Sequence, residues 1–187
     1  MPVAPAGGYS KSKWAAEEEI IRICETTGME YVILRPPLVY GPGVGANFLA
    51  LLKAVSGRYP LPLGGIDNMR SLVYVENLAD VIAGLIVSPA ARNQVYLVKD
   101  TDISTPDLVR ALSRAFGLAP RLYDWPPALL KVLAGIFNRG EMADRLTESL
   151  CVDDTKLRAA INWSPPVDSR TAIERTAAWF LSTRRGG

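Results

Sequence analysis

Hydrophobic and polar residues follow two different periods along the chain, and the period predicts the secondary structure of each segment. Helical spacing of apolar residues, with capping residues at the ends, predicts helices over 10–26, 47–56, 76–87, 104–116, 126–137, 153–161 and 169–183. Short apolar or alternating runs predict strands over 31–34, 70–75, 94–98 and 121–123. Because strands alternate with helices, the pattern indicates an α/β fold.

Tyr9 and Lys13 stand four residues apart at the start of the first predicted helix, so they share one helix face. An ammonium beside a phenol favours the phenolate and lowers the phenol's pKa from its usual value of about 10. A tyrosine with a lowered pKa can exchange a proton with a carbinol or a carbonyl. The spacing itself is common, however, and an exposed surface pair is the simpler interpretation of these two residues alone.

A dense set of prolines and glycines follows the predicted strand 31–34. The segment reads Arg35-Pro-Pro-Leu-Val-Tyr-Gly-Pro-Gly43, which predicts a stiff, extended loop just beyond the carboxyl end of that strand. In open α/β sheets, ligands bind at this edge. Without Tyr9 and Lys13, an ordinary turn would be the better interpretation of the segment.

Composition and charge narrow the classes of function. The chain has 187 residues, 49% of them hydrophobic, which suits a globular protein with one core or two small lobes. Its 21 basic and 19 acidic residues form no dominant basic block, so nucleic acid is not the favoured partner. We expect Arg184 and Arg185 to belong to a frayed tail. The chain has no histidine, which argues against a Cys/His zinc site and against a triad with a histidine base.

The two cysteines, Cys24 and Cys151, suggest a reducing compartment, so we expect a cytoplasmic protein without a disulfide framework. Cys24 lies within an apolar helical pattern and is expected to be buried. The first residues lack a basic region followed by an apolar run, so we expect no signal peptide. The longest apolar stretches, 81–87 and 128–137, are too short for a bilayer span, which needs roughly 20 residues.

Five features occur in a characteristic order over nearly the whole chain. They are Tyr9-Ser-Lys-Ser-Lys13, Leu34-Arg-Pro-Pro-Leu-Val-Tyr-Gly-Pro-Gly43, Asn47-Phe48, Arg70-Ser-Leu-Val-Tyr-Val-Glu-Asn-Leu-Ala-Asp80, and Asp153-Asp-Thr-Lys156 with Asn162-Trp-Ser-Pro-Pro166. In this order they resemble the extended short-chain dehydrogenase/reductase superfamily, specifically the NAD-dependent nucleotide-sugar epimerase/dehydratase family typified by UDP-glucose 4-epimerase.

The resemblance implies a fold and a domain organisation. We expect the C-terminal part of a Rossmann-type parallel sheet, together with a small, mostly helical substrate domain. Residues 1–43 and 76–100 would belong to the NAD-binding Rossmann domain, and residues 44–75 and 101–187 to the nucleotide-sugar domain. Members of the family often pair through the helix that carries the catalytic tyrosine, so the resemblance also implies a possible homodimer.

The resemblance also implies catalytic and cofactor roles. Tyr9 would move the sugar hydroxyl proton as hydride passes to or from the nicotinamide of NAD. Lys13 would lower the pKa of Tyr9 and hydrogen-bond the nicotinamide ribose. Pro36 and its neighbours would form a wall beside the nicotinamide, and Tyr40 would line the sugar pocket.

The remaining implied roles concern the substrate diphosphate. Asn47 would contact the diphosphate of a UDP-sugar, and Arg70 would pair with it, because a guanidinium fork matches phosphate geometry. Arg145 would be a second phosphate contact. For Arg70 alone, a solvated strand end is the alternative interpretation.

Three features of the family are missing from this sequence. There is no Gly-x-x-Gly-x-x-Gly turn, which holds the NAD pyrophosphate at a helix N-terminus, because Gly41-Pro-Gly-Val-Gly45 lacks the strand-to-helix context. The family's upstream catalytic serine or threonine and its first strands are also missing. The chain therefore resembles the C-terminal half of such an enzyme, and the edge of strand 31–34 would invite association.

The leading functional prediction is an NAD-dependent nucleotide-sugar 4-epimerase of polysaccharide biosynthesis, present here as a truncated chain. One alternative is a 4-keto reductase or dehydratase of the same family. Another, from a different class, is a non-catalytic remnant that binds a UDP-sugar or pairs with a separately made N-terminal half. The expected partners are a UDP-sugar and NAD, with no nucleic acid, no metal and no membrane span.

Overall fold

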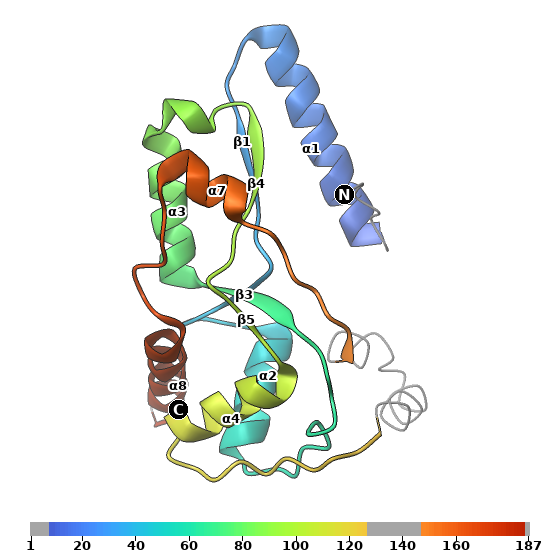
Figure 1. The fold of residues 1–187 in the computed structure, drawn as a ribbon, viewed down its shortest axis with the longest axis vertical. Helices are drawn as coiled ribbons and strands as arrows, with labels where there is room; N and C mark the ends of the chain where they lie inside the picture. Colours follow the sequence, from blue (N-terminus) through green and yellow to red (C-terminus); the bar gives the residue numbers. More distant parts are fainter. Residues whose placement is uncertain (1–7, 127–146, 186–187) are drawn as a thin grey trace.

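The computed structural model describes residues 8–126 and 147–185 and has a mixed α/β architecture (Figure 1). Its strands are short, and they are β1 (Val32–Arg35), β2 (Leu38–Tyr40), β3 (Arg70–Tyr74), β4 (Gln94–Leu97) and β5 (Thr101–Ile103). Its helices are α1 (Gly8–Thr27), α2 (Ala46–Ser56), α3 (Val75–Val87), the 3₁₀ helix η1 (Pro89–Ala91), α4 (Thr105–Ala115), α7 (Thr155–Ile161) and α8 (Ser169–Arg185).

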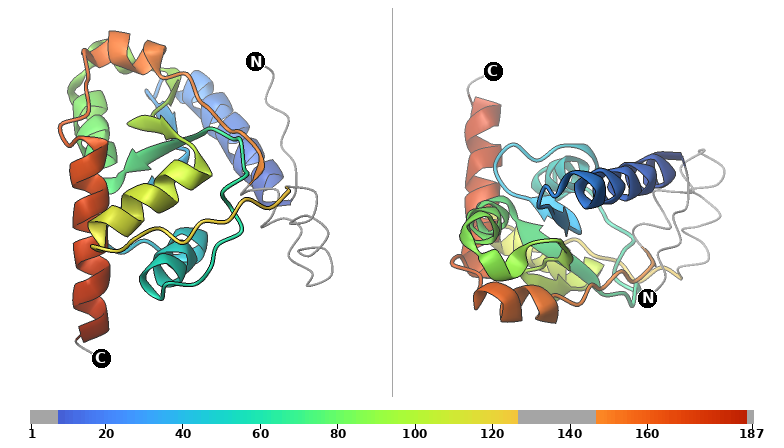
Figure 2. Two further views of the ribbon diagram at one scale, coloured as in Figure 1. Left: turned by 60° about the horizontal axis from the view of Figure 1, so that its bottom comes forward. Right: turned by 90° about the horizontal axis from the view of Figure 1, so that it is seen from above.

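The strands form two separate sheets. β1 and β4 pair in parallel, with Val32 opposite Gln94, and α1 and α3 lie on opposite sides of this pair (Figures 1 and 2). β2 pairs in parallel with β3, and β5 adds to β3 in the antiparallel sense. The crossover between parallel strands through a helix is the α/β arrangement that the sequence predicts.

The second sheet separates two hydrophobic cores, because successive side chains of a strand point to opposite faces. Leu72 and Tyr74 of β3 pack into the first core with α2, α4 and α8. Val73, which lies between them, packs into the second core. That second core also receives Leu157 of α7 and Trp163, whose indole Nε1 donates to Asp80 at 2.8 Å.

Most predicted elements are observed with boundaries shifted by one or two residues. The loop predicted over residues 35–43 contains strand β2, and strand β5 was not predicted at all. The strand predicted over 121–123 is wrong, since the segment forms only an isolated bridge between Leu122 and Leu61. The helix predicted over 126–137 falls almost entirely outside the described residues.

The last helix, α8, continues to Arg185, so the prediction that Arg184 belongs to a frayed tail is wrong. The guanidinium of Arg184 lies 5.6 Å from the ring centroid of Phe180, and its Nη1 donates to Ser56 Oγ at 3.2 Å. These contacts tie the end of α8 to the end of α2. None of the described helices is both long and apolar enough to cross a lipid bilayer.

Candidate active site

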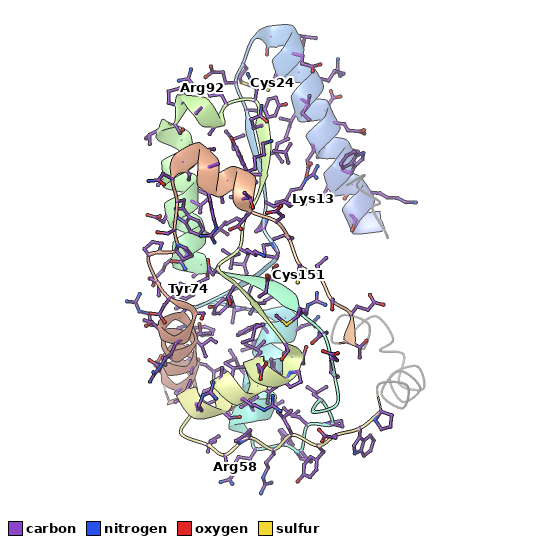
Figure 3. All side chains as sticks on the ribbon, in the orientation of Figure 1. Lys13, Cys24, Arg58, Tyr74, Arg92 and Cys151 are labelled. Atoms are coloured by element: carbon purple, nitrogen blue, oxygen red, sulfur yellow. The ribbon has the colours of Figure 1, made fainter. Side chains whose placement is uncertain are left out.

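The predicted acid–base pair lies at the start of α1. Tyr9 belongs to the first turn of this helix, and Lys13 follows one turn later. Lys13 is exposed, and Figure 3 shows it on the side of α1 that faces β1. The helix therefore presents this position toward the carboxyl end of a parallel strand, which is the edge where α/β sheets bind ligands.

Arg35, the last residue of β1, holds this part of α1 in place. Its guanidinium forms an ion pair with Glu17 through two nitrogens, and it also lies 5.2 Å from the ring centroid of Trp14. Trp14, Glu17 and Cys24 recur at helical spacing on one face of α1, and Cys24 is buried as predicted. The Arg35–Glu17 ion pair thus links the face of α1 that carries Lys13 to strand β1, which ends just before Pro36.

Pro36 and Tyr40 belong to one sequence motif, but the structure places Pro36 at the surface and Tyr40 in the first core. Pro36 is exposed immediately after β1. The Tyr40 side chain is 1% exposed and packs between Phe48, at 5.5 Å between ring centroids, and Tyr74, at 5.6 Å. Burial raises the pKa of the Tyr40 phenol, and the nearby Asp100 charge adds to this effect.

A cavity of about 530 Å³ opens between α2, the start of β3 and the start of α4. Two predicted substrate contacts, Asn47 of α2 and Arg70 of β3, both line it. Tyr40 is not among the described residues of its wall. The other lining residues are mostly apolar, namely Leu38, Phe48, Ala50, Leu51, Ala54, Leu61, Pro62, Leu63, Leu72, Ile103, Ser104, Thr105 and Leu108.

Arg70 is positioned by the segment that runs beside β3. Its Nη1 donates to the carbonyl oxygen of Glu148 at 2.9 Å. The backbone of Leu150 brackets the same residue, donating to Met69 O and accepting from Ser71 N, both at 2.9 Å. This bracing holds the guanidinium at the cavity wall. Arg145, the other predicted phosphate contact, lies outside the described residues.

The start of α4 forms a wall of the cavity that sequence reasoning did not assign to the site. Ser104 caps the helix by accepting from Asp107 N at 3.1 Å, and Thr105 N donates to the buried Asn68 Oδ1 at 2.9 Å. The Ser-Thr-Pro-Asp pattern correctly predicts a helix start. Nothing in that pattern indicates which cavity the helix end faces, because this depends on the packing of α4 against α2.

The fold and the site define a protein of the short-chain dehydrogenase/reductase type. A helix with the Tyr9 and Lys13 spacing lies beside parallel strands, and a separate cavity contains Asn47 and Arg70. The chain belongs to the NAD dependent epimerase/dehydratase family, whose profile matches residues 1–98.

Individual relatives agree with this assignment. The chain is 40% identical over 180 residues to a UDP-glucose 4-epimerase of Vibrio cholerae, an alignment that covers 95% of this chain and 55% of the relative. It is 28% identical over 191 residues to a UDP-glucose 4-epimerase of Mycolicibacterium smegmatis, covering 96% and 55%. The solved structure of Thermus thermophilus UDP-glucose 4-epimerase in complex with NAD superposes with a TM-score of 0.72 and 25% identity, covering 96% and 56%. The chain therefore spans about half the length of the relatives it matches.

Proposed function

We propose that the protein acts as an NAD-dependent nucleotide-sugar 4-epimerase and that this chain supplies its proton-transferring pair and its diphosphate contacts. The observation that carries the proposal is the convergence of Asn47 and Arg70 on one cavity. They are far apart in sequence, lie on different elements, and offer an amide and a guanidinium. The similarity to UDP-glucose 4-epimerase at 40% identity supports the choice of reaction.

The cavity suits a nucleoside diphosphate that carries a sugar. Arg70 can form two parallel hydrogen bonds to phosphate oxygens, and Asn47 can donate one more. The apolar walls formed by Leu61, Leu63 and Leu108 exclude water from these contacts and strengthen them. A UDP-sugar is thus the substrate class that we propose.

The described residues beside β1 fit part of an NAD molecule. Lys13 offers an ammonium donor toward the carboxyl end of β1, and the exposed ring of Pro36 offers an apolar surface there. A bound NAD would supply the hydride acceptor for oxidation at the sugar C4 and the hydride donor for the return step. Lys13 stabilises the phenolate of Tyr9, which takes up and returns the proton of the C4 hydroxyl.

We also propose several properties of the whole protein that rest on sequence and resemblance. The division into residues 1–43 with 76–100 and residues 44–75 with 101–187 remains our proposed domain organisation. Both cysteines are free thiols, which supports a cytoplasmic location. Ile20 and Ile23 expose apolar surface on α1, which supports either a homodimer through this helix or the docking of a complementing N-terminal half.

The alternative functions share the cavity but differ in chemistry. A 4-keto reductase or a dehydratase of the same family would use Tyr9 and Lys13 with a different fate for the 4-keto sugar. A non-catalytic UDP-sugar binder would use only Asn47 and Arg70.

A fusion protein separates these functions. The unmatched remainder of the Vibrio cholerae relative would be placed before this chain, so that Tyr9 and Lys13 are the acid–base pair of the hybrid. We expect it to interconvert UDP-glucose and UDP-galactose when NAD is present. Product is followed by chromatography. Tyr9→Phe should lower kcat by about a hundredfold or more, the usual contribution of a positioned acid–base group.

The matched control is Tyr59→Phe, which removes a phenol hydroxyl from a surface tyrosine. It should leave turnover unchanged. A hybrid that binds UDP-glucose and NAD but releases a 4-keto product would favour the reductase or dehydratase. A hybrid whose turnover is the same with Tyr9→Phe would refute the proposed role of this chain.

A further inference from the structure

The charges of this protein are unevenly balanced over its described surface. Most arginines pair with a neighbouring carboxylate, as in Arg22–Glu19, Arg92–Glu30, Arg110–Asp107, Arg158–Asp154, Arg170–Glu174 and Arg175–Glu76. Several cations form no ion pair with any described acidic group, and four of these lie near one end of the molecule. We call this set the basic end, and it consists of Lys53, Arg58, Arg121 and Arg184.

Hydrogen bonds bring the four residues together although they belong to three distant segments. Arg121 Nη1 donates to the carbonyl oxygen of Arg58 at 3.3 Å. Arg184 Nη1 donates to Ser56 Oγ at 3.2 Å, and that hydroxyl in turn donates to the carbonyl oxygen of Lys53 at 3.2 Å. Figure 3 shows Arg58 at the extreme end of the molecule, far from Lys13. All four side chains are exposed.

Three aromatic side chains are exposed beside these cations. Tyr59 is 64% exposed, Tyr123 52% and Trp125 41%. The two segments that carry them are joined by backbone bonds, since Leu61 N donates to Arg121 O and Tyr123 N donates to Leu61 O, both at 2.9 Å. Large aromatics exposed together on a folded surface, away from the core, indicate a binding surface.

The acidic groups around the basic end are few. Asp124 is the only acidic residue within 53–61 and 119–126. Its Oδ1 lies against Gly64, where the missing Cβ leaves room for it. Within these two segments, three exposed cations therefore stand against a single carboxylate, and Arg184 of α8 adds a fourth positive charge, while the whole chain carries a net charge of only +2.

Arginine and lysine beside exposed tyrosine and tryptophan have the chemistry that binds an anionic membrane surface. Tyrosine and tryptophan favour the membrane–water interface because one end of each side chain is apolar and the other is polar. Each lysine or arginine near an anionic bilayer strengthens binding about fivefold. Nucleic acid is disfavoured because the cations form a compact end and not a stripe that could follow a phosphate backbone.

We propose that the basic end, together with Tyr59, Tyr123 and Trp125, docks the protein on an anionic lipid surface. Leu61 belongs both to this surface's backbone bridge and to the wall of the cavity. Docking would therefore bring the proposed substrate cavity close to the lipid headgroups. Lipid binding needs neither NAD nor a UDP-sugar, so its test is independent of the proposed enzymatic function.

The test is co-sedimentation of the 187-residue chain with vesicles. One set contains equal parts of phosphatidylglycerol and phosphatidylcholine, and the other contains phosphatidylcholine alone. We expect binding to the anionic vesicles only, and we expect it to weaken as salt screens the charges. The triple variant Lys53→Ala, Arg58→Ala, Arg121→Ala should bind about a hundredfold more weakly. Trp125→Ala should also bind more weakly at unchanged charge.

The matched control is Lys11→Ala, which removes one exposed positive charge from α1 at a distance from the basic end. It should bind anionic vesicles as the unmodified chain does. Circular dichroism confirms that the variants are folded, as expected for exposed positions. The proposal is overturned if the unmodified chain does not bind anionic vesicles, or if the triple variant binds them as well as Lys11→Ala does. It is also overturned if the chain binds heparin but not the vesicles, which would assign the surface to a soluble polyanion.

Discussion

The two sides of this molecule differ in the extent of their hydrophobic packing and in the number of strands in their sheets. The side with the cavity has a continuous core in which α2, α4 and α8 pack around Leu52, Leu112 and Phe180. The side with the proposed acid–base pair has a two-stranded parallel sheet, and Arg35 of β1 joins α1 to it through the ion pair with Glu17. A two-stranded sheet is marginal by itself, and this one depends on the second core, to which Leu34 of β1 and Tyr96 of β4 contribute. The comparison teaches that the proposed substrate contacts and the proposed acid–base pair lie in parts of this chain that differ in packing.

The largest difference between the two sides is expected in the free energy of unfolding, when a side chain of the first core is truncated. Phe180 is buried and meets Phe116 edge-on, with 5.8 Å between ring centroids. Phe180→Ala should lower the free energy of unfolding by about 4 kcal/mol, because it removes a large ring and leaves a cavity. Denaturant unfolding measures this change.

The companion variant for the other side is Trp14→Ala, which removes the ring beneath Arg35. It should speed hydrogen exchange in α1 and change global unfolding by less than about 1 kcal/mol. Equal losses of global stability in Trp14→Ala and Phe180→Ala would contradict this comparison. They would mean that the packing of α1 matters as much to global stability as the first core does.

A substitution at Gly41 tests the close contact between the end of β2 and the start of α3. It adopts a φ of +140°, and a Cβ there would stand 2.5 Å from Val75 Cγ1, at the start of α3. Gly41→Ala should therefore cost about 2 kcal/mol of stability, as strain and a clash combine. Gly43→Ala is the control, since φ is +85° but a Cβ would meet no atom within 4 Å. A thermal shift as large in the control as in Gly41→Ala would show that the clash is unimportant.

A smaller effect should come from Asp100, which follows β4 where the two cores meet. Its Oδ2 accepts from Tyr74 N at 2.5 Å, and its Oδ1 is buried near the Asn77 side chain. Burial raises the pKa of this carboxyl above its usual value, although the Tyr74 amide opposes the shift. The folded state thus holds the proton more tightly than the unfolded state does.

For a carboxyl whose pKa is raised in the folded state, the stability it contributes is present below the unfolded pKa and is lost as pH rises through the folded pKa. Asp100→Asn abolishes this dependence. The variant should therefore gain stability relative to the unmodified chain as the pH rises from acidic to neutral. Unfolding at a series of pH values measures the gain. A relative stability that falls as pH rises would reverse the sign and refute the explanation.

The order and type of the elements could largely be predicted from the sequence, because apolar periodicity and caps act locally. β2 and β5 could not be predicted, since their pairing with β3 depends on partners that are remote in sequence. The segment 121–123 shows the opposite error. Its apolar character suits a strand, but only Leu122 finds a partner, in Leu61.

Sequence motifs could identify individual residues of the candidate site but not which of them lie together in the structure. Asn47 and Arg70 each belong to a recognisable motif, and the structure brings them to one cavity. Tyr40 belongs to an equally clear motif, yet it lies in the first core, because alternation along β2 turns it away from solvent. The basic end has no motif at all. Lys53 with Arg58, Arg121, and Arg184 belong to three separate segments of the sequence, and only tertiary packing brings these segments together.

The most direct test of the account is a calorimetric titration of the 187-residue chain with UDP-glucose, repeated with Arg70→Ala. The account predicts saturable binding by the unmodified chain. It also predicts a loss of about tenfold or more in Arg70→Ala, because that change removes charge-assisted hydrogen bonds to the diphosphate. Arg22→Ala, an exposed change on α1, should bind normally. A folded chain that does not bind UDP-glucose, or that binds it equally well with and without Arg70, would contradict the assignment of the cavity.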